Sequence, residues 1–307
     1  MSSAAIIGAG SVGSTIASFL IWGGAYEEII MIDINKERCE GEVMDLQDAG
    51  FLTDTQVRMG EYKDASSASI VIITAGAKQR KGETREALLQ RNVRILSSIA
   101  KSILPVKDDT LVLLVANPVD ILTQLFQEIS GIPRERVFGS GTFLDTMRLR
   151  TELSMRYNIA ATHIHTYIVG MHGDLQIPLW GVGNVASVPV EEFFRLTEKD
   201  KKAIGDAARD KAYKIISAKG STYYGIGACV AKLSAGFTQN RHQIYQLSTW
   251  HPQYGCYLSW PAVVSKKGVS GIVPVALTVK ETEIVKKAAA TIRFGVKNAL
   301  NPKKSKL

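Results

Sequence analysis

Three polar side chains in the middle of the chain have the types and spacing needed for acid–base chemistry on an anion. Asp145 and Arg148 lie three residues apart within the segment 139–150, so on a helix they share one face. His172 follows between two glycines at the end of an apolar run, where its imidazole would be accessible. Asp145 is a candidate carboxylate for fixing the histidine's tautomer. Arg148 would then be free to bind an anionic substrate through its planar guanidinium.

The pair of Asp145 and Arg148 also has a purely structural interpretation. Met147 and Leu149 are apolar, which indicates a buried face beside the two charges. A buried carboxylate and a buried guanidinium each need a partner, and they can simply be each other's. The segment alone leaves both interpretations open.

The N-terminal segment has the pattern of a dinucleotide-binding turn. A short apolar run leads into Gly8, Gly10 and Gly13, a helical pattern follows, and a second apolar run at 28–32 ends in Asp33. The first glycine permits a tight turn, the second lets the backbone approach a pyrophosphate, and the third allows close helix packing. Asp33 can accept hydrogen bonds from ribose hydroxyls and would repel a 2′-phosphate, which favours NAD over NADP. A βαβ unit whose glycines serve packing alone is the alternative.

The following elements would place these groups at one edge of a sheet. Apolar runs at 69–74 and 111–116 are typical of buried strands, and they alternate with helical stretches near 36–48, 86–103 and 119–130. This alternation predicts an α/β fold with a Rossmann-type doubly wound parallel sheet. Asn117 follows the second run and so lies at a carboxyl strand end, where ligands of such sheets bind. A turn asparagine before Pro118 is the alternative.

Residues 76–85 form a polar, basic segment between a predicted strand and its helix. A solvated loop is the simplest interpretation. A lid that closes on an anionic ligand is the other, with Gly82 near a hinge and Arg85 carried inward.

Beyond residue 140 the strict alternation weakens, which predicts a C-terminal α+β substrate domain. We expect strands near 163–170, 257–264 and 272–279, the last two antiparallel and joined at 266–268, and helices over 191–217, 222–238 and 281–299. The expected domains are 1–140, which binds NAD, and 141–307, which carries the catalytic and substrate-binding groups.

Composition limits the classes of function. With 307 residues, 46% hydrophobic and 21% charged, the chain can bury a large core, and it contains no apolar run long enough to cross a bilayer. The net charge of +8 is spread along the chain without an aromatic-interleaved basic patch, so we expect attraction of small anions rather than nucleic-acid binding. Three scattered cysteines match no metal spacing, and the start of the chain leaves no room for a signal peptide. We therefore expect a reduced, intracellular protein without a metal.

Taken together, the motifs resemble the lactate/malate dehydrogenase family, most closely its L-lactate dehydrogenases. They occur in the family's order over nearly the whole chain: GAGSVG, TAGAKQRKGETR, VANPVDIL, GSGTFLDTMRLR, MHGD and KGSTYYGIG. The resemblance implies reversible hydride transfer between NADH and pyruvate, or a related 2-keto acid, giving L-lactate. Malate dehydrogenase, or a broader L-2-hydroxy acid dehydrogenase, is the alternative.

The resemblance also implies roles for single residues. His172 would be the proton donor and acceptor, Asp145 its orienting carboxylate, and Arg85 the group that polarises the substrate carbonyl. The substrate would contact Arg148, Gln79, Asn117 and Thr222. NAD would contact Gly8, Gly10, Ser11, Val12, Gly13, Asp33, Thr74, Ala75, Gly76, Asn117 and Ile226.

Further implications concern partners and location. Arg150 and His165 match basic positions that line an anion site at a subunit interface, where bacterial members bind fructose 1,6-bisphosphate. Self-association as a homotetramer or dimer is implied. Met171 departs from the family, because lactate dehydrogenases commonly carry glutamate before the histidine. The last residues, Ser305-Lys306-Leu307, spell a peroxisomal import signal, which predicts an import receptor as partner and a peroxisomal pool beside a cytoplasmic one if the source is eukaryotic.

Overall fold

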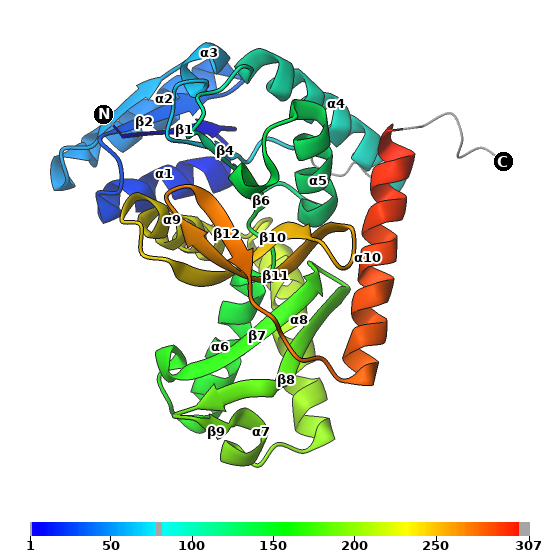
Figure 1. Cartoon of the computed structure of the whole chain (residues 1–307). Coiled ribbons are helices and arrows are strands. Elements are labelled where there is room, and N and C mark those ends of the chain that lie inside the picture. Colours follow the sequence, from blue (N-terminus) through cyan, green and yellow to red (C-terminus); the bar gives the residue numbers. More distant parts are fainter. Residues whose placement is uncertain (1, 78–81, 301–307) are drawn as a thin grey trace.

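Six parallel strands form the sheet of the N-terminal half (Figure 1). The computed structural model describes residues 2–77 and 82–300, apart from the side chain of Arg85. The strand order β3-β2-β1-β4-β5-β6 is the Rossmann order, which confirms the predicted doubly wound sheet. The strands are β1 (Ser3–Ile7), β2 (Glu28–Ile32), β3 (Gln56–Met59), β4 (Ile70–Ile73), β5 (Leu111–Leu114) and β6 (Val137–Gly139).

Helices cover both faces of this sheet because its strands are apolar on both sides. Along β1, Ala4 and Ile6 belong to one hydrophobic cluster, whereas Ala5 and Ile7 belong to the other. The first cluster includes side chains from α1 (Ser11–Gly23) and α2 (Lys36–Asp48), and the second from α3 (Tyr62–Ala65), α4 (Arg85–Ile103) and α5 (Val119–Ser130). The short 3-10 helices η1 (Gly50–Leu52) and η2 (Arg134–Arg136) complete this half.

The C-terminal half extends the same sheet with antiparallel strands. Its order from β6 is β10-β11-β7-β8-β9, with β12 paired to β11, and a single pairing of Ser248 with Gly139 joins the two halves. The added strands are β7 (Ile164–Met171), β8 (Leu175–Val185), β9 (Val188–Pro189), β10 (Gln243–His251), β11 (Cys256–Ser265) and β12 (Gly268–Ile272). The helices are α6 (Phe143–Tyr157), η3 (Ala161–His163), α7 (Val190–Phe193), α8 (Glu198–Lys219), α9 (Tyr224–Thr238) and α10 (Val279–Leu300).

Two expected elements of the C-terminal half were wrong in their bounds. The helix expected over 191–217 is two helices, because Thr197 and Asp200 form a capping box that starts a new helix at Glu198. The strand expected at 272–279 lies instead at Gly268–Ile272, pairing with β11 directly after a tight turn. The strands β3, β6, β8, β9 and β10 were not predicted at all.

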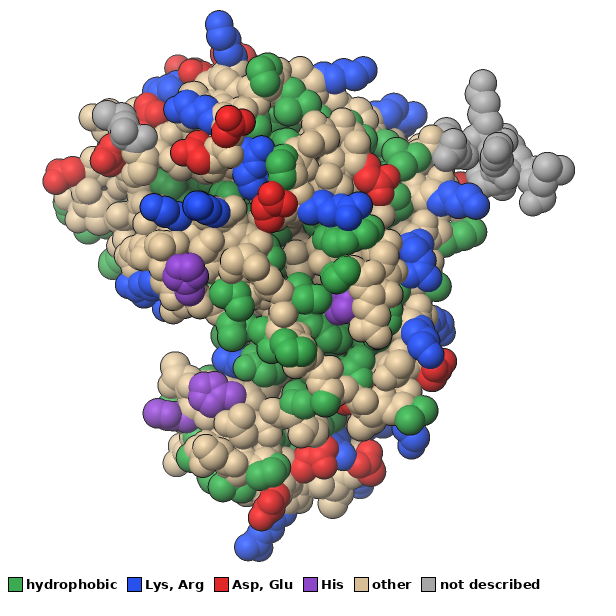
Figure 2. Space-filling model, viewed as in Figure 1, with side chains coloured by type: hydrophobic (Ala, Val, Ile, Leu, Met, Phe, Trp, Pro, Cys, Tyr) green, Lys and Arg blue, Asp and Glu red, His purple; other side chains and the backbone are tan. Residues whose placement is uncertain are grey.

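The surface carries both signs of charge. On the face seen in Figure 2, lysine and arginine side chains are interspersed with aspartate and glutamate, and a hollow lies between the upper and lower parts. Across the described ranges, no helix combines the length and the apolar character that a bilayer-spanning segment needs.

Candidate active site

One buried carboxylate holds both of the cationic groups that the sequence singled out. Asp145 Oδ2 lies 2.6 Å from Nδ1 of His172, and its Oδ1 accepts a hydrogen bond from Arg148 at 3.1 Å. Asp145 is 2% exposed and Arg148 8%, whereas the His172 side chain is 27% exposed. The two interpretations of the Asp145–Arg148 pair are therefore both part of the structure, because the ion pair exists and the same carboxylate also orients the histidine.

Two threonines fix this arrangement by joining α6 to β7. Thr142 Oγ1 donates a hydrogen bond to the Ile168 carbonyl at 2.5 Å, and the Ile168 N–H donates to Thr146 Oγ1 at 3.0 Å. All three residues are fully buried. Asp145 projects from the same helix as the threonines, so the contact sets the distance between the carboxylate and the strand end that carries His172.

The electrostatics favour a charged pair. Burial opposes the protonated form of His172, but the Asp145 carboxylate outweighs it and raises the pKa of the imidazole above its ordinary value. Burial likewise opposes ionisation of Asp145, but His172 and Arg148 together lower the pKa of that carboxyl. An imidazole held in this way can deliver a proton to an oxygen and take it back near neutral pH.

A small cavity of about 170 Å³ collects most of the predicted substrate-side groups. Its walls include Asn117, Arg148, His172, Thr222 and Ile226, from five separate parts of the chain. A second cavity of about 600 Å³ shares Asn117 and His172, and its other walls come mainly from α4, α10 and the turn between β7 and β8. Gln79 and the side chain of Arg85 lie outside the described residues.

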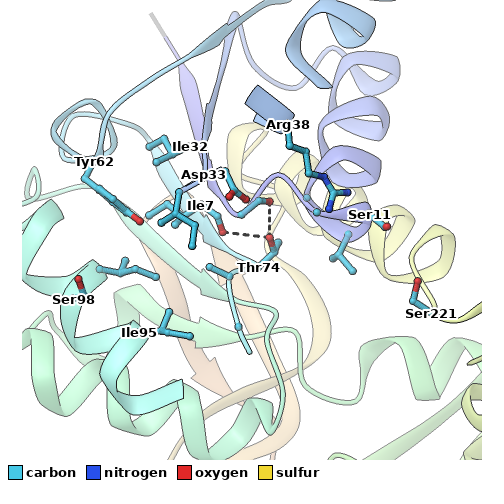
Figure 3. A pocket seen from close by; sticks show the side chains of 18 residues that line it. Ile7, Ser11, Ile32, Asp33, Arg38, Tyr62, Thr74, Ile95, Ser98 and Ser221 are labelled. Carbon is cyan, nitrogen blue, oxygen red and sulfur yellow. Dashed lines mark hydrogen bonds between the residues drawn. The ribbon is translucent and has the colours of Figure 1, made fainter. Parts of the chain in front are cut away.

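The glycine turn opens into a separate cavity of about 450 Å³, shown in Figure 3. It is lined by most of the predicted cofactor residues: Gly8, Gly10, Ser11, Val12, Gly13, Asp33, Thr74, Ala75 and Gly76. Thr74 Oγ1 donates to the Gly8 carbonyl at 2.9 Å, and Asp33 Oδ2 accepts from the Ala9 N–H at 2.7 Å, so both side chains brace the turn. Val12 lines this cavity and the small one, which places the two side by side.

Arg150 contacts the main chain directly after His165, and neither residue lines the small cavity. Arg150 Nε donates to the carbonyl of Thr166, the residue after His165, at 3.1 Å. Burial lowers the pKa of the Arg150 guanidinium, and within the described ranges no carboxylate pairs with it. His165 is exposed on β7.

Comparison with known protein families identifies the family to which this chain belongs. Residues 3–139 match the lactate/malate dehydrogenase NAD-binding domain, and residues 142–302 match the alpha/beta C-terminal domain of the same family. The chain belongs to the lactate/malate dehydrogenase family. It is 40% identical over 292 residues to L-lactate dehydrogenase A of Rhizopus oryzae, covering 95% of this chain and 91% of the relative. An L-lactate dehydrogenase of Clostridium botulinum is 36% identical over 304 residues, with 96% of both chains covered.

Solved structures of lactate dehydrogenases are similar to this chain over nearly its whole length. A lactate dehydrogenase, MGS-M5, from a Medee basin deep-sea metagenome superposes with a TM-score of 0.94 at 35% identity, covering 97% of this chain and 99% of the other. The minor L-lactate dehydrogenase of Enterococcus mundtii gives 0.93 at 32% identity, covering 97% and 98%.

The glycine turn fits the NAD that this lactate/malate dehydrogenase family binds. A Cβ built on Gly10 would meet nothing within 4 Å, so the backbone there faces open space, while a Cβ on Gly13 would lie 1.8 Å from the Gly8 carbonyl. One glycine therefore leaves room for a pyrophosphate and the other permits the helix to pack on the turn. Among the described residues no side chain caps α1, which leaves its N-terminal N–H groups for an anion.

Several lining residues were missed because no local pattern marks them. Tyr62, Ile95 and Ser98 line the dinucleotide cavity from α3 and α4, at positions that look like an ordinary helix face. Asn92 is 1% exposed; its Oδ1 accepts from the Ala77 N–H at 2.7 Å and its Nδ2 donates to the Asn117 carbonyl at 3.3 Å. A buried asparagine on a helix that otherwise buries apolar residues is the one signal that could have found it.

Proposed function

We propose that the protein is an NAD-dependent L-lactate dehydrogenase that catalyses reversible hydride transfer between NADH and pyruvate. The observation that carries the proposal is the single carboxylate, Asp145, which holds a proton donor and an anion-binding guanidinium beside one small cavity. That cavity adjoins the dinucleotide cavity at Val12. The names of the relatives favour lactate over malate as the hydroxy acid.

The chain's own residues account for binding and proton transfer. NAD, when bound, supplies or accepts the hydride. Arg148 binds the substrate carboxylate, and His172 donates a proton to the keto oxygen during reduction and removes it during oxidation. Asp145 stabilises the imidazolium that the reverse direction creates, and Asn117 and Thr222 complete the walls around the substrate. We assign polarisation of the carbonyl to Arg85, in line with the family resemblance.

A spectrophotometric assay tests this proposal. NADH oxidation should be fast with pyruvate and slow with oxaloacetate, and NAD reduction should occur with L-lactate and not with D-lactate. No turnover of any 2-keto acid by protein shown to bind NADH would contradict the proposal. Equal rates with pyruvate and oxaloacetate would instead favour a broader L-2-hydroxy acid dehydrogenase.

Substrate choice should depend on Gln79, which lies outside the described residues. The second carboxylate of oxaloacetate would meet a neutral amide there, and an unpaired charge in a closed site costs about 3 kcal/mol or more, which is over a hundredfold in rate. Gln79→Arg is therefore expected to move the ratio of kcat/KM for oxaloacetate over pyruvate upward by at least that factor. Gln79→Asn is the neutral control, and an unchanged ratio in the arginine variant would remove the assignment.

We also propose that the chain divides at residue 140 into the two domains expected from sequence and that it self-associates as a dimer or tetramer. Exposed apolar side chains at Trp22, Met44 and Phe51 support self-association. Light scattering coupled to size-exclusion chromatography gives the assembly state, and a monomer at assay concentration would contradict this part.

Arg150 and His165 are proposed to form an anion site that takes fructose 1,6-bisphosphate. The half-buried Arg150 guanidinium, which contacts the Thr166 carbonyl and the Tyr167 ring and has no carboxylate partner among the described residues, supports an anion there. We expect the bisphosphate to lower the pyruvate concentration at half-saturation several-fold and Arg150→Gln to abolish that effect. Identical saturation curves with and without the bisphosphate would show that the two residues serve contacts between subunits alone.

A peroxisomal pool beside a cytosolic one is proposed on the tail Ser305-Lys306-Leu307, which lies outside the described residues, for a eukaryotic source. A fluorescent protein fused to the N-terminus of a chain that ends at Leu307 should show peroxisomal puncta. The same fusion without the last three residues should be diffuse. Diffuse signal from both would leave the tail without a targeting role.

A further inference from the structure

A second buried carboxylate, Asp120, lies on the main-chain side of His172. It belongs to the first turn of α5, three residues after Asn117, and is 1% exposed. Its Oδ2 accepts a hydrogen bond from the main-chain N–H of His172 at 2.8 Å, and its Oδ1 accepts from Ser259 Oγ at 2.7 Å. His172 is therefore held at two points, its ring by Asp145 and its backbone by Asp120.

Among the described residues, His172 is the cationic group that acts on Asp120. In the described part of the chain no lysine or arginine forms an ion pair with it. Burial raises the pKa of this carboxyl, and its hydrogen bonds, together with the charge on His172, lower it only in part. Burying a carboxylate costs desolvation free energy, which a specific interaction must offset. Here that interaction is with His172, the residue proposed to transfer the proton.

The location of Asp120 reflects three elements that meet under the end of β7. Ser259 pairs with Ser248 across β10 and β11, and it also pairs with Gly170 of β7, two residues before His172. Ser248 and Ser259 are fully buried, and the Ser248 hydroxyl, which has no hydrogen-bond partner by geometry among the described residues, lies close enough to Asp120 to lower the pKa of that carboxyl. The carboxylate therefore ties α5 to the strand end through side chain and main chain at once.

We infer that Asp120 is a positioning residue for His172, fixing the histidine's backbone while its negative charge favours the protonated imidazole. This inference rests on the proposed function, in which His172 transfers the proton. It assigns the dehydrogenase site two carboxylates with separate tasks. Asp145 orients the ring, and Asp120 holds the main chain from which the ring projects.

The sign of the charge effect follows from the groups that face the imidazole. From α6 these are Asp145 and Arg148, and from α5 Asp120. The larger cavity beside His172 is also lined by Glu86, Asp174 and Tyr213. Burial and Arg148 lower the pKa of His172, whereas the two aspartates raise it. Removing the charge of Asp120 should therefore lower this pKa, so that pyruvate reduction fails at a lower pH.

Asp120→Asn tests the charge with both hydrogen bonds kept, because the amide oxygen can accept from His172 N–H and the amide nitrogen can donate to Ser259. We expect the upper pKa in the pH profile of kcat/KM for pyruvate to fall by about half a unit or more. Asp120→Ala, which also frees the backbone, should in addition lower kcat by about tenfold or more. Asp206→Asn on α8 is the control: it removes one carboxylate charge that is paired with Lys202, and it should leave the pH profile of kcat/KM unchanged.

The outcomes separate positioning from mere stability. If both Asp120 variants lower Tm and leave the pH profile of the folded enzyme unchanged, Asp120 is structural and the inference is overturned. If the alanine variant does not fold, the asparagine profile decides alone. Titration of the His172 ring by proton NMR, assigned with His172→Asn, gives the same pKa without turnover. A wild-type protein that reduces no 2-keto acid would thus overturn the proposed function, while the NMR shift still tests Asp120.

Discussion

His172→Asn is expected to lower kcat for pyruvate reduction by a factor of about 10² to 10⁴ while leaving NADH affinity within about twofold. Asparagine can still donate a hydrogen bond to Asp145, but it cannot carry a proton to the keto oxygen, and general acid catalysis contributes about that factor. The histidine lies at the strand end rather than in the dinucleotide cavity, so cofactor binding has no reason to change. Steady-state kinetics and NADH fluorescence titration measure the two quantities.

The pH profile provides an independent check on the same residue. Because the pKa of His172 is raised in the folded protein, wild-type pyruvate reduction should persist to a pH above the ordinary histidine range and fall as the imidazole loses its proton. Lactate oxidation needs the neutral ring, so it should rise over the same interval. His163→Asn, which alters an exposed histidine on η3, is the matched control. A His172→Asn enzyme with an unchanged profile would assign the proton to another group.

Arg148→Leu should raise KM for pyruvate by about a hundredfold to a thousandfold, the second large effect. The substrate carboxylate would lose a charged, two-pronged partner, and breaking such a buried pair costs about 3–5 kcal/mol. Asp145 would also lose a hydrogen bond at 3.1 Å, so the variant should show a lower Tm as well. The effect on KM is measured at saturating NADH.

Arg148→Lys separates charge from geometry in the same experiment. Lysine keeps the positive charge beside Asp145 but cannot form the parallel pair of hydrogen bonds, so we expect an intermediate KM and a Tm near that of the wild type. A lysine variant with wild-type KM would mean that the carboxylate is bound elsewhere. Arg156→Leu, which removes an exposed arginine from the last turn of the same helix, serves as the control for loss of an arginine from α6.

The sequence was most informative where chemistry is carried by neighbours along the chain. The glycines before α1, Asp33 at the end of β2, and the spacing of Asp145 and Arg148 depend on local geometry, so pattern and structure agree. The missed features depend on distant contacts. Tyr62 and Ser98 reach the dinucleotide cavity only through packing of α3 and α4. The role of Asp120 is visible only from its contacts with residues at the end of β7 and in β11, which are distant in sequence.

The errors in the C-terminal half have a similar origin. The composition of 191–217 is that of one continuous polar helix. Thr197, however, acts as an N-cap, so a second helix begins at Glu198. The strand β8 has a mixed burial pattern and contains Pro178 and two glycines, which hide its period of two. β12 is short and glycine-rich, and it is held by its register with β11 rather than by its own side chains.

That a single carboxylate, Asp145, serves both His172 and Arg148 has a thermodynamic consequence for the assembled enzyme. When a keto acid carboxylate arrives at Arg148, it adds a negative charge near the imidazole and so favours the protonated ring. By linkage, the protonated ring must favour the keto acid to the same extent. Binding of pyruvate should therefore draw a proton from the buffer wherever His172 is partly neutral. Lactate brings the same carboxylate, but its hydroxyl can donate a hydrogen bond to the neutral ring, whereas the keto oxygen of pyruvate can only accept one from the protonated ring. The proton on His172 therefore acts as a linked ligand, so a lower solution pH favours binding of pyruvate over lactate.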